Sequence, residues 1–396
     1  MHDENQNHET QENPMKRYAL FSVLCIFVWC LFRTATCSAG WDGYRWPIYR
    51  GDRSLTGVAE GSLPDSMRLL WSFETGDEIK SSPVIDKETV YIGSTDGKVY
   101  ALRLKDGRKI WEFDTGVAVE ASPLILKSTV YVGSLDGMFY AIDSRTGTVR
   151  WTHETGNRIA GSANWVSAAS GKGYWILIGS YDNILYCVDA DTGKRVWQYE
   201  TENFINGAPS LYEKDGQQVV FGGRDAYVHL VSVENGTLSL KIHAGSYIAA
   251  SAAVYGGCAY LGHYGNRLIS VDLERGRILW EYGDDDEGGA FFSSPAVTED
   301  RVIAGSKDWK VHCVDRRNGK RIWTFAAGGE VDSSPVICGD KVAVGSTDGF
   351  VYMLKLEDGK ELWSYEIGEG ITSSPAVAQG MVIIGSDDGV VYGFGK

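Results

Sequence analysis

The chain has 396 residues, a formal net charge of −14 at neutral pH and 12% aromatic residues. The acidic balance and the absence of a basic cluster exclude a nucleic-acid-binding protein of the usual electrostatic type. Seven cysteines are present, and the four that follow Cys37 lie in strand-like patterns and match no zinc-ligand spacing. We therefore expect those four to be small buried side chains.

The N-terminal residues 1–39 have the pattern of a polar leader followed by a signal peptide. A Lys-Arg pair precedes a mainly apolar stretch, residues 18–32, and small and polar residues follow it. This stretch is shorter than the roughly 20 residues that a membrane-spanning helix needs. We expect export to the periplasm or cell envelope, with cleavage after Ala39 or near Ala35. An uncleaved N-terminal membrane anchor and a lipid anchor on Cys37 are the alternatives.

Residues 40–66 form a lead-in segment that is punctuated by glycine and proline and carries several aromatic residues. This composition favours an irregular extended chain over a regular element. We expect the aromatic side chains to lie across an outer face of the body that follows.

The sequence over residues 67–396 repeats, with steps of 40 to 46 residues between equivalent positions, and this repeat dominates the fold prediction. One marker is a tryptophan late in each unit, replaced once by Leu240, and it occurs at Trp71, Trp111, Trp151, Trp197, Trp280, Trp323 and Trp363. The second marker, usually Asp-Gly, occurs at Asp96, Asp136, Asp182, Asp225, Gly265, Asp308, Asp348 and Asp388. The first tryptophan has no Asp-Gly before it, and the last Asp-Gly has no tryptophan after it. A closed ring explains this offset, because the segment at about residues 69–75 can supply the strand that the C-terminal unit lacks.

Each unit has the pattern of four antiparallel strands. Segments such as residues 89–94 and 98–104 alternate with period two, and the Asp-Gly pairs between them suit tight hairpin turns. Radial stacking buries both faces of such sheets and leaves only short edges. The sequence therefore predicts an all-β protein, an eight-bladed β-propeller of four-stranded antiparallel blades. The tryptophans are predicted to dock between blades, where burying one indole contributes at most about 4–6 kcal/mol.

Blades 3, 4 and 5 depart from the repeat. Blade 3 carries an insertion with Trp165 and Trp175, blade 4 has Leu240 in the tryptophan position, and blade 5 has HYGN at residues 263–266 in place of Asp-Gly. Either this sector is adapted as a surface that binds a partner, or the repeat sequence has diverged here because the ring is stable enough to tolerate the changes.

Six polar residues are predicted to surround one mouth of the central channel. In a four-stranded meander, the turn between strands two and three lies at the same end of the ring as the link between blades. Residues just before each first strand should face the channel there, namely Lys80, Glu120, Arg158, Asn206, Asp332 and Thr372, with Phe291 and Phe292 beside them. These residues would suit a polar planar ligand or a partner peptide, and they would equally suit a channel filled with water.

Two segments carry a specific motif. Residues 141–151 are AIDSRTGTVRW and residues 187–197 are CVDADTGKRVW. Their pattern, Gly/Ala-x-Asp-x-x-Thr-Gly-x-x-x-Trp, resembles the tryptophan-docking repeat of the PQQ-like, or quinoprotein-type, β-propeller family. The resemblance covers about residues 69–396 and includes the BamB-like members, which work in outer-membrane β-barrel assembly.

The resemblance also raises the question of a cofactor. Quinoprotein dehydrogenases hold pyrroloquinoline quinone (PQQ) at the channel mouth under a vicinal cysteine pair, with an aspartate base beside calcium. This sequence has no two adjacent cysteines and no long insertion to cover a pocket, so no catalytic residue carries over. The acidic run at residues 284–287 has oxygen ligands that calcium accepts, but its spacing is not that of an EF-hand and we expect a solvated loop. We expect no cofactor and no metal site.

These observations predict an exported, non-catalytic propeller that binds protein or peptide partners in the cell envelope, as a BamB-like scaffold in outer-membrane protein assembly. The alternative is an oxidoreductase or sensor that binds PQQ, with calcium. A third interpretation is a sugar- or polymer-binding surface protein that uses the aromatic residues at positions 41–49. We expect the closed ring to be monomeric.

Overall fold

The computed structural model describes residues 1–2, 45–214, 217–283 and 288–396. The predicted signal peptide and the acidic run at residues 284–287 lie outside the described residues. Within these ranges the elements are all strands, and no helix is long and apolar enough to cross a membrane.

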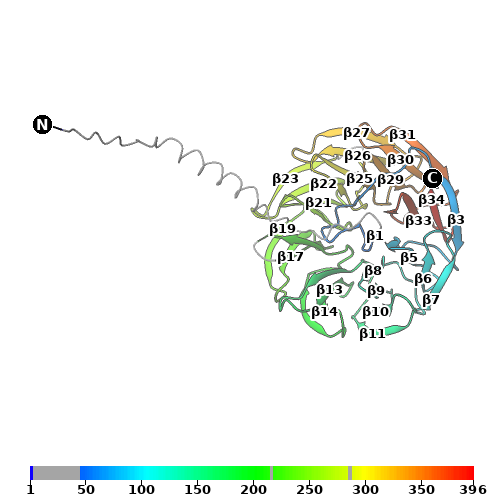
Figure 1. Cartoon of the computed structure of the whole chain (residues 1–396), viewed down its shortest axis with the longest axis horizontal. Helices are drawn as coiled ribbons and strands as arrows, with labels where there is room; N and C mark the ends of the chain where they lie inside the picture. The colour runs from blue at the N-terminus through cyan, green and yellow to red at the C-terminus, as the bar shows by residue number, and fades with distance from the viewer. Residues whose placement is uncertain (3–44, 215–216, 284–287) are drawn as a thin grey trace. The chain divides into compact units, whose positions relative to one another are not determined.

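Eight antiparallel four-stranded blades form a closed ring, which confirms the predicted eight-bladed β-propeller (Figure 1). The blades follow one another around the ring in chain order, and each begins with a short inner strand.

Blades 1 to 4 have the following strands in chain order. Blade 1 contains β4 (Val84–Asp86), β5 (Thr89–Gly93), β6 (Lys98–Arg103) and β7 (Lys109–Asp114). Blade 2 contains β8 (Leu124–Leu126), β9 (Thr129–Gly133), β10 (Met138–Asp143) and β11 (Val149–Glu154). Blade 3 contains β12 (Asn164–Ser167), β13 (Tyr174–Gly179), β14 (Ile184–Asp189) and β15 (Arg195–Glu200). Blade 4 contains β16 (Ser210–Glu213), β17 (Gln217–Gly222), β18 (Tyr227–Ser232) and β19 (Leu238–His243).

Blades 5 to 8 continue the pattern. Blade 5 contains β20 (Ala253–Tyr255), β21 (Cys258–His263), β22 (Arg267–Asp272) and β23 (Arg277–Tyr282). Blade 6 contains β24 (Ala296–Val297), β25 (Arg301–Gly305), β26 (Lys310–Asp315) and β27 (Arg321–Ala326). Blade 7 contains β28 (Val336–Cys338), β29 (Lys341–Gly345), β30 (Phe350–Lys355) and β31 (Glu361–Glu366). Blade 8 contains β32 (Ala376–Ala378), β33 (Met381–Gly385), β34 (Val390–Gly395) and β3 (Arg68–Glu74).

The ring is closed by β3, the fourth strand of blade 8. It pairs antiparallel with β34 in a register that places Ser72 opposite Tyr392. The two strands lie side by side near the C-terminus (Figure 1). An N-terminal strand therefore completes the C-terminal blade, as the offset of the two sequence markers predicts.

Neighbouring blades contact each other around the tryptophan positions. A bulge leaves Ile110 unpaired and 50% exposed, and the next residue, Trp111, turns inward and is 8% exposed. The Trp111 indole N–H donates to the carbonyl of Ser144 in blade 2 at 2.9 Å. The same ring lies against Gly147, where an added Cβ would be 2.9 Å from the indole and φ is +74°. The Thr-Gly of the motif is thus required by close packing and by a left-handed backbone conformation.

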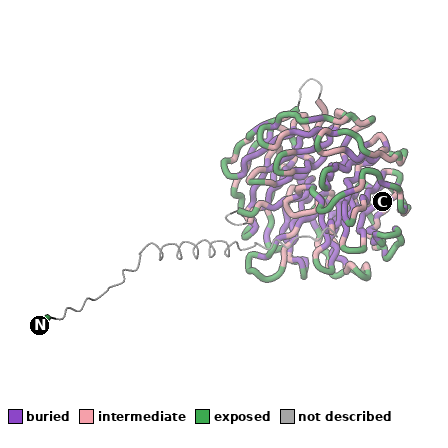
Figure 2. Tube along the Cα trace, turned by 45° about the horizontal axis from the view of Figure 1, so that its top comes forward, coloured by how far each residue is buried: buried purple, intermediate pink, exposed green. Residues whose placement is uncertain are grey.

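The same indole-to-carbonyl bond links further pairs of blades, through Trp71, Trp151, Trp197, Trp280 and Trp323. Leu240 takes the equivalent position in blade 4 and lies against Gly276, where an added Cβ would be 3.1 Å from its side chain. Trp363 faces blade 8, whose strands come from both ends of the chain, and it packs edge-on against Phe394 at 5.4 Å. Apolar clusters of this kind fill the spaces between blades, so the buried chain lies inside the ring and the exposed chain lies mainly at its turns (Figure 2).

The lead-in runs through the channel and not across an outer face, which corrects the prediction from sequence. Its strand β1 (Arg45–Trp46) pairs antiparallel with β4, and β2 (Val58–Ala59) pairs parallel with β28. Between them, amides of the inner strands of blades 2, 4, 5, 6 and 7 donate hydrogen bonds of 2.8–2.9 Å to lead-in carbonyls, at Pro47, Arg53, Ser54, Thr56 and Gly57. Each inner strand is an edge strand whose amides need partners, and in these blades the lead-in supplies them.

Arg50 fixes the lead-in at the centre of the ring. Its side chain is 1% exposed and donates to the carbonyls of Ser334, at 3.0 Å, and Pro335. Burial lowers the pKa of the guanidinium to about 10. Gly57 is required beside it, because a Cβ there would lie 2.0 Å from the guanidinium.

Candidate functional site

A constant backbone frame surrounds one mouth of the channel. In blade 1 the amide of Thr95, in the Asp-Gly turn, donates to the carbonyl of Glu78, in the link that leads into the same blade, at 2.9 Å. The same bond recurs in all eight blades at 2.9–3.0 Å. The donors are Thr95, Leu135, Tyr181, Arg224, Tyr264, Lys307, Thr347 and Asp387. The acceptors are Glu78, Ala118, Arg158, Phe204, Tyr247, Ala290, Glu330 and Gly370. We call these sixteen residues the outer rim, in which the backbone is constant and the side chains vary.

A pocket of about 170 Å³, which we call the cup, lies inside the outer rim. The hydroxyl of Tyr49, from the lead-in, contacts the hydroxyls of Ser294 at 3.1 Å and Ser334 at 2.9 Å. Because the lead-in occupies the channel behind Tyr49, the cup is approached from the mouth.

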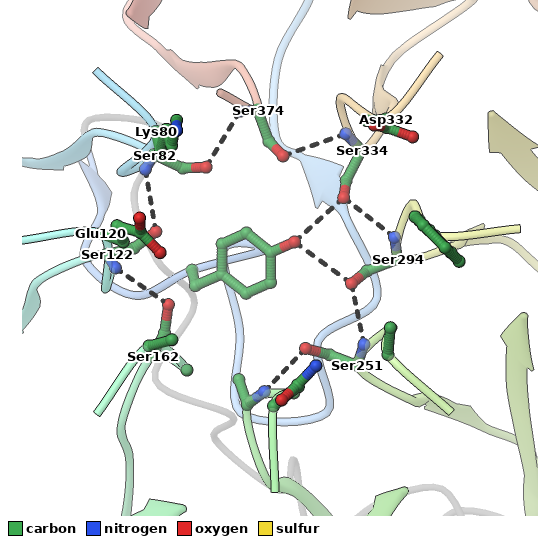
Figure 3. Close-up of a pocket in the computed structure, with 18 of the residues that line it drawn as sticks. Lys80, Ser82, Glu120, Ser122, Ser162, Ser251, Ser294, Asp332, Ser334 and Ser374 are labelled. Atoms are coloured by element: carbon green, nitrogen blue, oxygen red, sulfur yellow. Dashed lines mark hydrogen bonds between the residues drawn. The ribbon is translucent and has the colours of Figure 1, made fainter. Parts of the chain in front are cut away.

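A ring of serines encloses the cup (Figure 3). The backbone N–H of six of these serines donates to the hydroxyl of the serine in the next blade at 2.9–3.2 Å, and the exception is Ser162, which is followed by an alanine in blade 4. The ring comprises Ser82, Ser122, Ser162, Ser251, Ser294, Ser334 and Ser374. Blade 4 has Ala208 instead, and its amide still donates to Ser251 at 2.8 Å. The second serine of the recurring Ser-Ser-Pro was therefore a usable sequence signal for this ring.

The structure brings five of the six predicted mouth residues to the cup. Its lining includes Lys80, Glu120, Asn206, Asp332 and Thr372. Arg158 is exposed in the outer rim, and Ala160 takes the position that was assigned to it. Counting two residues back from the ring serine gives Lys80 in blade 1 and Ala160 in blade 3, so the prediction was out of register by two residues. Phe292 lines the cup, whereas Phe291 is buried between blades and 2% exposed. A ligand at these residues stays a prediction.

Carboxylates predominate on the side of the mouth formed by blades 7, 8, 1 and 2. Lys80 pairs with Glu78 at 2.9 Å, and Lys307 pairs with Asp332 at 3.0 Å and with Glu330. Five carboxylates face these two ammonium groups, an excess of three negative charges, and the five are Glu78, Glu120, Glu330, Asp332 and Asp387.

Lys80 and Asp387 are among the charged groups here whose pKa values are shifted. The hydrogen bond that Lys80 donates to Glu78 raises the pKa of Lys80, so this ammonium stays charged and paired. Burial raises the pKa of Asp387, against the effect of a 2.9 Å hydrogen bond from the Thr372 hydroxyl. Glu120 has no hydrogen bond or ion pair with any described residue, and it is the lining carboxylate most open to a new partner.

Aromatic side chains occupy the opposite side of the mouth. Tyr181 stacks on Phe204 with ring centroids 5.0 Å apart, and Tyr264 contacts Phe292 at 4.5 Å and Tyr247 at 6.4 Å. These five residues, which we call the aromatic arc, come from blades 3 to 6. Two cations already use their faces: Arg224 lies 5.2 Å from the centre of Tyr264, and Lys307 lies 4.9 Å from that of Phe292. The arc therefore lies in and beside the sector where the sequence departs from the repeat.

The residues that line the cup do not fit PQQ with calcium. PQQ carries several carboxylates and needs cations, whereas the one lysine that lines the cup is paired and the other charged lining residues are Glu120 and Asp332. The cup is also smaller than the roughly 300–1,000 Å³ typical of cofactor sites. Within the described ranges no group of three or more His, Cys, Asp or Glu side chains is placed to hold a metal ion.

The cysteines do not resemble a redox pair. Cys187, Cys258, Cys313 and Cys338 are free thiols in separate blades. Burial raises the pKa of Cys338 to about 11 and that of Cys313 to about 12, so both thiols stay protonated at neutral pH.

Comparison with known families decides the affiliation. The family model described as outer membrane protein assembly factor BamB matches residues 64–203, 182–326 and 307–396. This chain belongs to the BamB family. The matched ranges together contain all eight blades, which confirms the resemblance inferred from the tryptophan motif. Comparison with curated proteins finds no significant match.

Solved structures similar to this BamB-family chain include a BamB protein, an alcohol dehydrogenase and a designed protein. BamB from Moraxella catarrhalis is 20% identical, with a TM-score of 0.67 over 83% of this chain and 98% of that chain. A quinohemoprotein alcohol dehydrogenase from Comamonas testosteroni is 14% identical, with a TM-score of 0.75 over 89% of this chain and 81% of that chain. The computationally designed Ika8 protein is 18% identical, with a TM-score of 0.71 over 83% of this chain and 100% of that chain. At these identities the likeness establishes the fold alone.

Proposed function

We propose that this chain is an exported, non-catalytic propeller that binds a protein partner in the cell envelope through its mouth, and that it serves the assembly of outer-membrane proteins. The family description, an outer membrane protein assembly factor, supports the setting. The structural observation that carries the proposal is the outer rim, where one backbone bond is repeated eight times beneath side chains that differ from blade to blade. A rigid frame with variable side chains is suited to partner recognition.

The test is site-specific photo-crosslinking in the source organism. A photoreactive amino acid replaces Tyr247, which is 54% exposed on the outer rim, and in a control it replaces Leu238, which is 45% exposed just after the Asn-Gly turn at the other end of blade 4. We expect crosslinks to an envelope protein from the Tyr247 position only. We also expect deletion of the gene to lower the amount of β-barrel proteins in the outer membrane.

Two results would contradict the proposal. Equal crosslinking from both positions would show that the mouth is not the binding face. Unchanged outer-membrane barrel levels after deletion, with no envelope protein crosslinked at Tyr247, would remove the assembly role.

A further inference from the structure

The two halves of the cup differ in charge: one has three charged side chains and Thr372, and the other has only uncharged side chains, of which Asn206 is polar. Around the ring, the position two residues before the ring serine is Asp332, Thr372, Lys80 and Glu120 in blades 7, 8, 1 and 2. In blades 3 to 6 it is Ala160, Asn206, Ala249 and Phe292. Each half spans four neighbouring blades, so Glu120 in blade 2 lies across the ring from Phe292 in blade 6.

The cup has unused hydrogen-bond acceptors. Asn206 Oδ1 and Asp332 Oδ1 are buried and have no hydrogen-bond partner in the structure. Glu120 adds a carboxylate that has no hydrogen bond or ion pair with any described residue, although the charge of Lys80 lies near enough to interact with it. The hydroxyls of the serine ring already accept backbone N–H bonds. A ligand that supplies donors and a positive charge would satisfy these groups, because buried acceptors without partners are costly.

From this division we infer that the cup binds the side chain of a lysine on an extended segment of the protein partner. A lysine has an apolar stem and a compact ammonium with three donors. The stem would lie along Ala160, Ala249 and Phe292, and the ammonium would reach Glu120 and Asp332. The segment on either side of the lysine would lie over the aromatic arc, whose rings attract cations and apolar groups.

The site favours a peptide lysine over a free amine. The cup is small, at about 170 Å³, and it opens onto a wider face that carries the exposed Tyr247. A free polyamine would use the cup and leave the aromatic arc uncovered, whereas a peptide would cover both. This inference rests on the proposed function, because it names what the mouth recognises in its partner.

The experiment measures binding of a fluorescein-labelled peptide, Ala-Phe-Lys-Phe-Ala, to the purified chain by fluorescence anisotropy. The matched peptide carries Nε-acetyl-lysine, which keeps the apolar stem of the side chain and removes its charge, and a second matched peptide carries norleucine, which keeps the stem without an amine. We expect acetylation to weaken binding roughly tenfold or more, because a charge-assisted hydrogen bond is lost. Glu120→Gln should weaken binding of the lysine peptide to a similar degree. Glu234→Gln, at an exposed carboxylate beyond β18 at the end opposite the mouth, should leave it unchanged.

Three results would overturn the inference. Equal affinity for the lysine and acetyl-lysine peptides would show that the cup does not bind an ammonium group. The proposal that the mouth binds a protein partner would then still be tested separately, by the crosslinking experiment. Binding of spermidine that depends on Glu120 and is as tight as that of the peptide would assign the cup to free amines. If neither the lysine nor the acetyl-lysine peptide binds, and the melting temperature shows that the chain is folded, the cup is not a peptide-binding site. Glu120→Gln is expected to fold normally, because Glu120 makes no hydrogen bond or ion pair with a described residue and Gln has nearly the same shape.

Discussion

Single side chains at the mouth show how the ring holds polar groups at its axis. The Tyr49 hydroxyl joins the lead-in to Ser294 and Ser334, and these two serines also bond to each other through backbone and hydroxyl at 2.9 Å. Thr372 donates to Asp387, which burial makes harder to ionise. The contacts of Tyr49 join residues that are 245 and 285 positions apart in the sequence, whereas Thr372 and Asp387 are 15 positions apart.

The first prediction concerns Asp387. Because its folded pKa is raised above the ordinary value of 3.8, the folded state holds the proton more tightly than the unfolded state. Its contribution is therefore greatest in acid and is lost as pH rises above about 4. We expect Asp387→Asn to raise the free energy of unfolding, relative to wild type, at pH 7 and not below pH 4. Urea titrations at the two pH values measure this, with the exposed Asp191→Asn as control, and an equal gain at both values would contradict it.

The second prediction concerns Tyr49. Tyr49→Phe removes the hydroxyl that bridges two ring serines and keeps the aromatic ring. We expect it to lower the free energy of unfolding by about 1 kcal/mol, the usual net value of such a bond. Tyr247→Phe, at a side chain that is 54% exposed, is the control and should change little. No difference between the two variants in a urea titration would show that the bridge to the serine ring is not stabilising.

At the scale of the blade, the repeat motif describes an interface between neighbours and not a property of one sheet. Trp280 donates to the carbonyl of Arg316 at 2.9 Å and lies on Gly319, so one blade supplies the indole and the next supplies the glycine turn. Blade 4 keeps the glycine of its neighbour but has Leu240 where the indole would be. We therefore predict that the contacts of the seven tryptophans contribute much of the free energy that holds neighbouring blades together.

The third prediction exchanges the two side chains. Trp280→Leu should lower the free energy of unfolding by about 2–3 kcal/mol, through lost apolar burial and a carbonyl left without its donor. Leu240→Trp should raise it by about 1 kcal/mol, because an indole there can stack on Gly276 and donate to Leu273, which has the place of Arg316. Urea unfolding of both variants tests the pair, and destabilisation by both would show that the interface of blades 4 and 5 is packed differently.

At the scale of the whole molecule, the ring is held by two segments that precede the first blade. The strand β3 closes the circle on β34, and the lead-in joins the inner strands of six blades through backbone pairing. Asn164 of blade 3 also reaches the lead-in, donating to the carbonyl of Arg53 at 2.8 Å. The lead-in therefore acts as an internal brace for nearly the whole circle.

The fourth prediction removes this brace. A chain that begins at residue 60 keeps β3 and all the blades, so we expect a circular dichroism spectrum with the same strand signal. It should melt at a lower temperature, because the inner-strand amides of five blades lose their protein partners to water. Adding the peptide of residues 45–59 in trans should restore much of the loss, and a scrambled peptide should not. An unchanged melting temperature would show that the lead-in does not stabilise the ring.

The sequence predicted the ring well because repeat, turn and strand signals are local. Two markers that each occur eight times, out of phase at the ends, required an eight-bladed circle with β3 in blade 8. The position of Lys80, Glu120, Asn206, Asp332 and Thr372 at one mouth followed from the geometry of a meander. The placement of Arg158 was in error because blade 3 was read two residues out of register with its serine.

Local sequence alone thus determined the period, the number of blades and the closure, since each depends on residues within one unit and on counting. Only the tertiary structure decided that the lead-in enters the channel, that Tyr49 joins the serine ring, and that an aromatic arc faces a carboxylate-rich side. These features join residues that are up to 285 positions apart, such as Tyr49 and Ser334, and no local pattern encodes them. These features have one physical cause. Closing the circle creates unpaired inner strand edges and a channel mouth, and the polar groups brought together there must form hydrogen bonds and ion pairs with one another.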